Sequence, residues 1–198
     1  MKEFLESGER SLAEPLDFVH PPTLVIGLGN PILGDDGVGW RVAERVKMSL
    51  SEQLEGMAIS EASSNLPGNF LVEVDCLSLG GLSLMERLIS YDRAILIDAI
   101  TTHQKPAGHV ACFPLDDLPK QVVGHLSSAH DTTLQTAIEV GRSLGARLPE
   151  QIMIVAIESQ ISYNFSELLS PEVEAAVPQA EKIVLQLLTE WAETPADC

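Results

Sequence analysis

Two adjacent acids, Asp35 and Asp36, stand in a glycine-rich segment that runs from Gly27 to Gly39 after a short apolar stretch. Two carboxylates at the start of a helix repel a phosphate group and favour a cation instead. The third glycine of a dinucleotide-binding fingerprint would fall at Ile32, so the segment does not predict a nucleotide site. Its residue types are compatible with metal chemistry.

The two acids have different expected roles. Aspartate is favoured at helix N-caps and first turns, where it meets the positive end of the helix dipole, and we expect this structural role for Asp35 taken alone. Asp36 directly precedes the helix-starting Gly37. Its carboxylate can therefore point out over the edge of a sheet.

Two further acids follow apolar stretches that are typical of buried strands. Asp98 follows Ala94–Ile97, and Asp75 follows Phe70–Val74. Burying a carboxylate is costly unless it is paired, hydrogen-bonded or bound to a metal. A turn-forming role stays open for both acids, and it is stronger for Asp75 because the polar residues after it can hydrogen-bond its carboxylate.

One of the five histidines stands apart, although each histidine taken singly is expected at the surface or at a helix end. His130 lies in the segment 127–131, at or just before a predicted helix N-terminus. The helix dipole disfavours protonation there, which keeps the imidazole neutral and available as a metal ligand.

Short buried strands alternate with amphipathic helices along the chain, which indicates βαβ units and ligand sites beyond the carboxyl ends of the strands. We expect an α/β fold with three α/β/α layers around a twisted, mixed, mostly parallel sheet of about five strands. The expected strands are 23–26, 70–74, 94–97, 152–157 and an antiparallel edge strand at 108–113, with a further short strand at 57–59. The expected helices are 38–50, 80–89, one from a cap at Ser127 or Ser128 to Gly145, and 171–191, which Pro178 kinks or splits.

The length of 198 residues predicts one domain, residues 23–192, between an extension at 1–22 and a frayed tail at 193–198.

The formal net charge of -17 argues against nucleic acid and anionic membranes as partners. The 3 cysteines form no CxxC pair, which argues against a disulfide framework. The N-terminus is unlike a signal peptide, and no apolar stretch reaches the roughly 18 residues of a membrane span, so we expect a cytoplasmic protein.

The pattern of glycines and acids in the first loop, with Asn30 after the second glycine, resembles the N-terminal signature of the [NiFe]-hydrogenase maturation endopeptidases. The likeness extends from about Leu24 to Leu188, and four ordered matches are more specific than any one of them. The later matches are Asp75 with Gly80-Gly81, Ile97-Asp98-Ala99, and Ser127–His130. The resemblance implies a phosphorylase/hydrolase-like fold and makes residues 23–192 a catalytic domain.

The resemblance also implies a site. In that family three residues from separate motifs coordinate a metal, and the matching positions here are Asp36, Asp98 and His130, as both catalytic and metal-binding residues. Asp75 and Asn30 are expected near the substrate. Two oxygen ligands and one imidazole suit a borderline divalent metal such as nickel, and zinc also fits.

The implied activity is that of a nickel-dependent, aspartyl-protease-like endopeptidase. It removes a C-terminal peptide from the nickel-loaded large-subunit precursor of a [NiFe]-hydrogenase, and the nickel belongs to that substrate. Two other functions stay open. A nickel-binding or chaperone homologue would keep every ligand. A peptidyl-tRNA-hydrolase-like enzyme shares the opening Gly27–Pro31, but the Thr-Arg-His-Asn segment of that family is absent.

Overall fold

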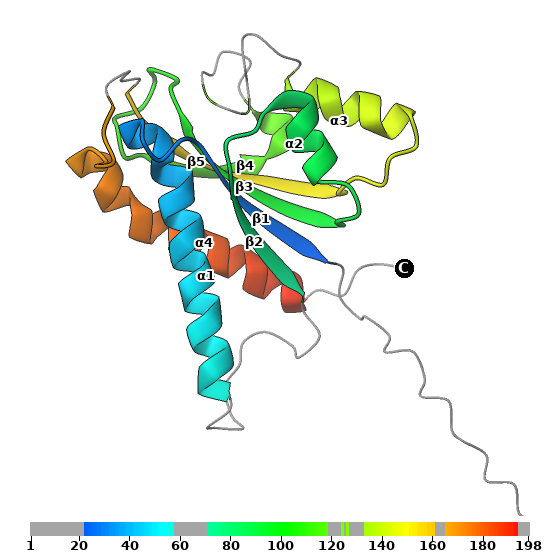
Figure 1. Cartoon of the computed structure of the whole chain (residues 1–198), viewed down its shortest axis with the longest axis horizontal. Coiled ribbons are helices and arrows are strands. Elements are labelled where there is room, and N and C mark those ends of the chain that lie inside the picture. Colours follow the sequence, from blue (N-terminus) through cyan, green and yellow to red (C-terminus); the bar gives the residue numbers. More distant parts are fainter. Residues whose placement is uncertain are drawn as a thin grey trace, which may run out of the picture.

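The computed structural model describes residues 22–57, 71–118, 124, 126, 133–160 and 165–193, and they form a five-stranded sheet with helices on both faces (Figure 1). The strands are β1 Thr23–Leu28, β2 Val72–Leu77, β3 Arg93–Ile100, β4 Val110–Pro114 and β5 Gln151–Glu158. The helices are α1 Val38–Met57, α2 Gly81–Arg87, α3 Leu134–Ser143 and α4 Pro171–Glu193, with short 3-10 helices η1 Gly34–Gly37 and η2 Leu115–Asp117. The predicted α/β fold is confirmed.

The strand order determines where a ligand site can form. The order is β2-β1-β3-β5-β4, and all neighbouring strands are parallel except β4, which pairs antiparallel with β5 at one edge. Since β2 and β3 lie on opposite sides of β1, the direction of the chain across the sheet reverses between β1 and β3. Ligand crevices of open α/β sheets form at such a reversal, beyond the carboxyl ends of the strands.

Two hydrophobic cores lie on the two faces of the sheet. Alternate residues of β1 point to opposite faces, so Leu24 and Ile26 belong to the core beneath α2 and α3, whereas Val25 belongs to the core beneath α1 and α4. Figure 1 shows the two helix pairs on opposite sides. Burial of both faces explains why the central strands are continuous apolar stretches in the sequence.

Glycines allow α1 to begin directly against the sheet. A β-carbon at Gly39 would overlap the carbonyl oxygens of Leu28 and Ile97, and one at Gly27 would overlap the carbonyl oxygen of Gly39. The first turn of α1 therefore rests on backbone atoms of both β1 and β3. This contact places η1, which directly precedes α1, between the ends of β1 and β3, where the strand order reverses.

Several expected element ends are wrong. β2 and β3 continue past Asp75 and Asp98, so both acids lie within strands instead of following them. The reason is that the backbone ladder continues: Asp75 is aligned with Ile26, and Asp98 with Ala156. α1 extends to Met57, where a short strand was expected to begin. Residues 58, 59 and 70 lie outside the described part of the chain.

The two later helices also differ from expectation. The N-cap of α3 is Thr133, whose hydroxyl accepts a hydrogen bond from the backbone N–H of Thr136, and not Ser127 or Ser128. The last helix is not split, because α4 continues through Pro178 as one helix. Its buried stripe, which includes Val177, Ala180 and Val184, offsets the cost of the backbone hydrogen bond that the proline cannot donate.

The proposed division into extension, domain and tail stays a prediction, because residues 1–21 and 194–198 lie outside the described ranges. None of the described helices is long and apolar enough to span a membrane.

Replacing Gly39 with Ala tests the contact between α1 and the sheet. The added methyl group meets two backbone carbonyls that cannot rotate away, so we expect the free energy of unfolding to fall by about 2–3 kcal/mol. Urea denaturation measures this loss. The control Lys47→Ala, at an exposed position of the same helix, should change stability by less than about 0.5 kcal/mol. If the two variants were equally stable, the claim that α1 requires a glycine at position 39 would be wrong.

Candidate active site

The first loop holds Asp36 in a defined position. The backbone N–H of Asn30 donates to Asp36 Oδ2 over 2.7 Å, and the side-chain oxygen of Asn30 accepts from the N–H of Ile32 over 3.2 Å. Gly29 has a φ of 129°, and a β-carbon there would overlap the carbonyl oxygen of Asp36. The half-buried Asp36 carboxylate is thereby fixed close to the end of β1.

Asp35 has a structural role, as expected, but its partner is a distant helix. Its carboxylate accepts from the backbone N–H of Ser170 over 2.6 Å and from the Ser170 hydroxyl over 2.9 Å. The carbonyl of Ser170 accepts the N–H of Glu174 over 2.9 Å, which places Ser170 at the start of α4. Asp35 therefore ties the first loop to α4, and the two adjacent acids are used differently.

Asp98 is a fully buried acid, with 0% of the residue exposed. Its Oδ2 accepts a hydrogen bond from the backbone N–H of Leu126 over 3.2 Å. A β-carbon at Gly124 would lie 3.1 Å from the same oxygen, so the chain passes close to this carboxylate. Backbone hydrogen bonding of this kind offsets part of the cost of burying a charge.

Asp36 and Asp98 lie at the same edge of the sheet. Gly39 approaches the carbonyl of Ile97, the residue before Asp98, and η1 contacts β3. The loop that carries Asp36 and the strand that carries Asp98 thus meet where the direction of the chain reverses. This is the edge at which the sheet order places a ligand crevice.

His130, the third predicted ligand, lies outside the described residues. Leu126, which contacts Asp98, precedes it by four positions in the sequence. Within the described ranges, no group of three or more His, Cys, Asp or Glu side chains is arranged to hold a metal ion. The predicted ligand set of Asp36, Asp98 and His130 therefore stays a prediction.

Asp75 is engaged in an ion pair. Its Oδ2 accepts from Nε of Arg87 on α2 over 3.0 Å, and Arg87 also pairs with Glu73 and donates to the Tyr91 hydroxyl over 3.1 Å. β1 lies between the strands of Asp75 and Asp98, and Asp75 is aligned with Leu96, two residues before Asp98. Standard strand spacings give a Cα–Cα separation of roughly 12 Å between the two acids. Its expected role near the substrate, like that of Asn30, stays a prediction.

Glu158 is a second buried acid at this edge, and it was not among the predicted site residues. Only 4% of Glu158 is exposed, and its carboxylate accepts from the N–H and hydroxyl of Thr102, each over 2.8 Å, and from the N–H of His103 over 3.0 Å. It thereby holds the turn after β3. The available signal was an acid directly after the apolar stretch 152–157, the pattern already noted for Asp98.

Burial disfavours the thiolate form of the two described cysteines. Burial raises the pKa of the Cys76 thiol to about 11, and burial also raises the pKa of Cys112. A thiol with a raised pKa is protonated at neutral pH, whereas a catalytic cysteine needs a thiolate.

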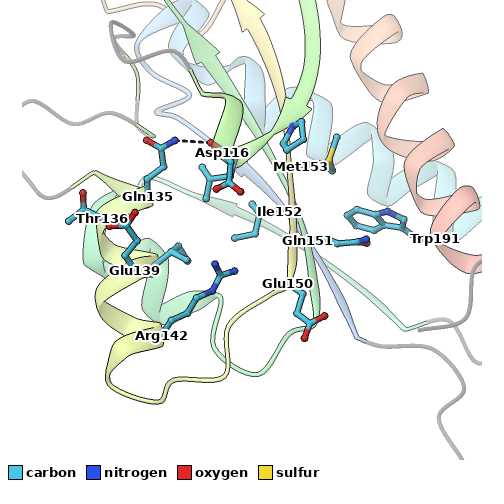
Figure 2. Close-up of a pocket in the computed structure, with 13 residues that line it drawn as sticks. Asp116, Gln135, Thr136, Glu139, Arg142, Glu150, Gln151, Ile152, Met153 and Trp191 are labelled. Carbon is cyan, nitrogen blue, oxygen red and sulfur yellow. Dashed lines mark hydrogen bonds between the residues drawn. The ribbon is translucent and has the colours of Figure 1, made fainter. Parts of the chain in front are cut away.

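An open pocket of about 640 Å³ lies away from this site (Figure 2). It is lined by the first residues of β5, by α3 and by Trp191 near the end of α4. Figure 2 shows Arg142 between Glu139 and Glu150, and the Arg142 guanidinium donates to the carbonyl of Pro149 over 2.8 Å. Because β5 is parallel to β3, its first residues lie at the edge opposite Asp98, so this pocket is separate from the candidate site.

Comparison with known proteins identifies the family. The model of the hydrogenase maturation protease family matches residues 73–187, and the chain belongs to this family. A hydrogenase expression/formation protein HupD from Bradyrhizobium diazoefficiens is 26% identical over 171 residues, covering 86% of this chain and 80% of the relative. HoxM from Azotobacter vinelandii, described in the same words, is 22% identical over 173 residues, covering 86% and 73%.

Solved structures share the fold. The hydrogenase maturating endopeptidase HybD from E. coli aligns with a TM-score of 0.60 at 22% identity, covering 85% of this chain and 93% of that chain. The [NiFe] hydrogenase maturation protease HybD from Thermococcus kodakarensis aligns with a TM-score of 0.54 at 22% identity, covering 84% and 99%. The fold expected from the sequence is thus that of known maturation proteases.

Substitution of Asp35 by Ala tests its structural role. The N–H and hydroxyl of Ser170 both lose a charged acceptor, so we expect the free energy of unfolding to fall by about 1.5–3 kcal/mol. Ser170→Ala removes only the hydroxyl contact and should cost less. Thermal and urea denaturation of both variants measure the difference, and an Asp35→Ala protein as stable as wild type would refute the tether.

Proposed function

We propose that this protein removes a C-terminal peptide from the nickel-loaded large-subunit precursor of a [NiFe]-hydrogenase. Membership of the maturation protease family supports the reaction class. The observation that carries the proposal is the fully buried carboxylate of Asp98, at the sheet edge where the loop of Asp36 also ends. Two carboxylates at this edge are candidate oxygen ligands, and the strand order favours a ligand site there.

The proposed ligand set is Asp36, Asp98 and His130. The short sequence distance from Leu126, which contacts Asp98, to His130 supports this assignment. Two carboxylates and one neutral imidazole suit nickel, and zinc is an alternative occupant. In this proposal nickel is part of the precursor and serves as the feature that the enzyme recognises.

We propose that the nickel polarises the scissile carbonyl and that a carboxylate assists the attacking water. Asp36 and Asp98 are the two candidate carboxylates. Asn30 holds the loop around Asp36, and Asp75 pairs with Arg87 of α2. We propose that both residues lie near the bound precursor without acting on its scissile bond. The proposed location of the reaction is the cytoplasm, because the 3 cysteines form no CxxC pair and suit a reducing compartment.

Intact-mass analysis of the precursors tests this function directly. Each large-subunit precursor of the same organism is incubated, with and without nickel, with wild-type protein, His130→Ala or Asp36→Asn. We expect loss of a C-terminal peptide only with nickel and wild-type protein. Asp36→Asn removes a candidate acid–base group, which lowers the rate by roughly 10²-fold or more. His130→Ala removes a proposed nickel ligand, so both variants should leave the precursor uncut.

Asp116→Asn is the control for Asp36→Asn, because Asp116 is an exposed acid beside the pocket at the opposite edge of the sheet. It should cleave the precursor at temperatures where it is folded. Full cleavage by the folded His130→Ala protein would overturn the site assignment. No mass change in any nickel-loaded precursor with wild-type protein would favour a nickel-binding role without catalysis, and metal affinity would then be measured.

A further inference from the structure

Three apolar side chains are exposed beside the loop of Asp36. Phe165 is 82% exposed, Leu168 79% and Ile32 46%, and we call these three residues the apolar rim. They come from two segments that are joined by an isolated parallel bridge between Leu33 and Ser166. Figure 1 shows the start of α4, which follows residues 165–170, near the start of α1.

Backbone hydrogen bonds join the two segments of the apolar rim. The N–H of Ser166 donates to the carbonyl of Ile32 over 3.0 Å, and the N–H of Gly34 donates to the carbonyl of Ser166 over 2.6 Å. The guanidinium of Arg41, from the first turn of α1, also donates to the carbonyl of Glu167 over 3.3 Å. The rim is therefore built on the same loop that fixes Asp36.

Side chains complete the anchoring of the segment 165–170. Asp35 binds both the N–H and the hydroxyl of Ser170. The Ser166 hydroxyl donates to the carbonyl of Leu168 over 3.1 Å and accepts its N–H over 3.0 Å. The anchored segment therefore holds two large apolar side chains in water beside Ile32, and exposed apolar patches mark interaction sites.

We propose that the apolar rim is the docking surface for an apolar stretch of the large-subunit precursor next to its cleavage site. This inference rests on the proposed function, and it adds the residues that select the substrate. Leu33 and Gly34 of the bridge lie two or three positions before Asp36. A chain that places its scissile bond at Asp36 therefore passes within reach of the rim.

Charge favours this occupant over a second copy of the protein. Each chain has a formal net charge of -17, so two copies repel one another as they approach. Glu167 is exposed between Phe165 and Leu168, which adds a negative charge to the surface itself. The complementary partner is an apolar stretch flanked by basic residues.

The test measures precursor binding and cleavage separately. The double variant Phe165→Ser/Leu168→Ser is compared with wild type and with Leu144→Ser, a control residue that is 82% exposed after α3 at the opposite edge. Binding of the nickel-loaded precursor is measured by biolayer interferometry and cleavage by intact mass. Thermal melts verify that each variant is folded.

We expect the double variant to bind the precursor more weakly, because apolar anchors dominate interface affinity. Its KM should rise by on the order of tenfold or more, while its kcat stays within about twofold of wild type. Leu144→Ser should behave as wild type. Cleavage by wild type with an unchanged KM in the double variant would overturn the inference alone. Absence of cleavage by wild type itself would overturn the proposed function and this inference together. Wild-type self-association that the double variant abolishes would identify a second copy as the occupant and also overturn it.

Discussion

The close contact between α1 and the sheet is the constraint on which the candidate site depends. Because Gly39 has no side chain, the first turn of α1 rests on the carbonyls of Leu28 and Ile97. These two residues belong to the strands between which the chain reverses direction. The same contact therefore brings the loop of Asp36 and the strand of Asp98 to one edge, and a larger residue at Gly39 would separate them.

The two adjacent acids of the first loop connect this edge to the rest of the molecule in different ways. Asp36 is held by the N–H of Asn30 within the loop, whereas Asp35 binds the residue that begins α4. The tether from Asp35 also anchors the segment that carries Phe165 and Leu168. The proposed catalytic loop and the proposed docking surface thus share one set of backbone contacts, which links substrate selection to the position of the carboxylates.

Much of the fold was predictable because its signals are local: apolar stretches, helical periodicity and a glycine-rich loop. The antiparallel edge strand was also expected, and β4 confirms it. A structural role at the start of its own helix was expected for Asp35, whereas its carboxylate binds Ser170 before α4. The ion pair of Asp75 with Arg87 and the anchored segment 165–170 were not predicted, because both depend on contacts between distant elements. The predicted ends of β2 and β3 were wrong for a related reason. Backbone hydrogen bonds to neighbouring strands extend a strand beyond its apolar stretch.

The central claim is that the buried carboxylate of Asp98 acts on the nickel-loaded precursor. The most direct measurement is the single-turnover cleavage rate of that precursor by Asp98→Asn, with folding and precursor binding verified. The control is Asp116→Asn, an exposed acid beside the pocket at the opposite edge. The account predicts that Asp98→Asn binds the precursor but cleaves it at least about 10²-fold more slowly, while Asp116→Asn cleaves at the wild-type rate. Wild-type cleavage by the folded Asp98→Asn protein would contradict the account.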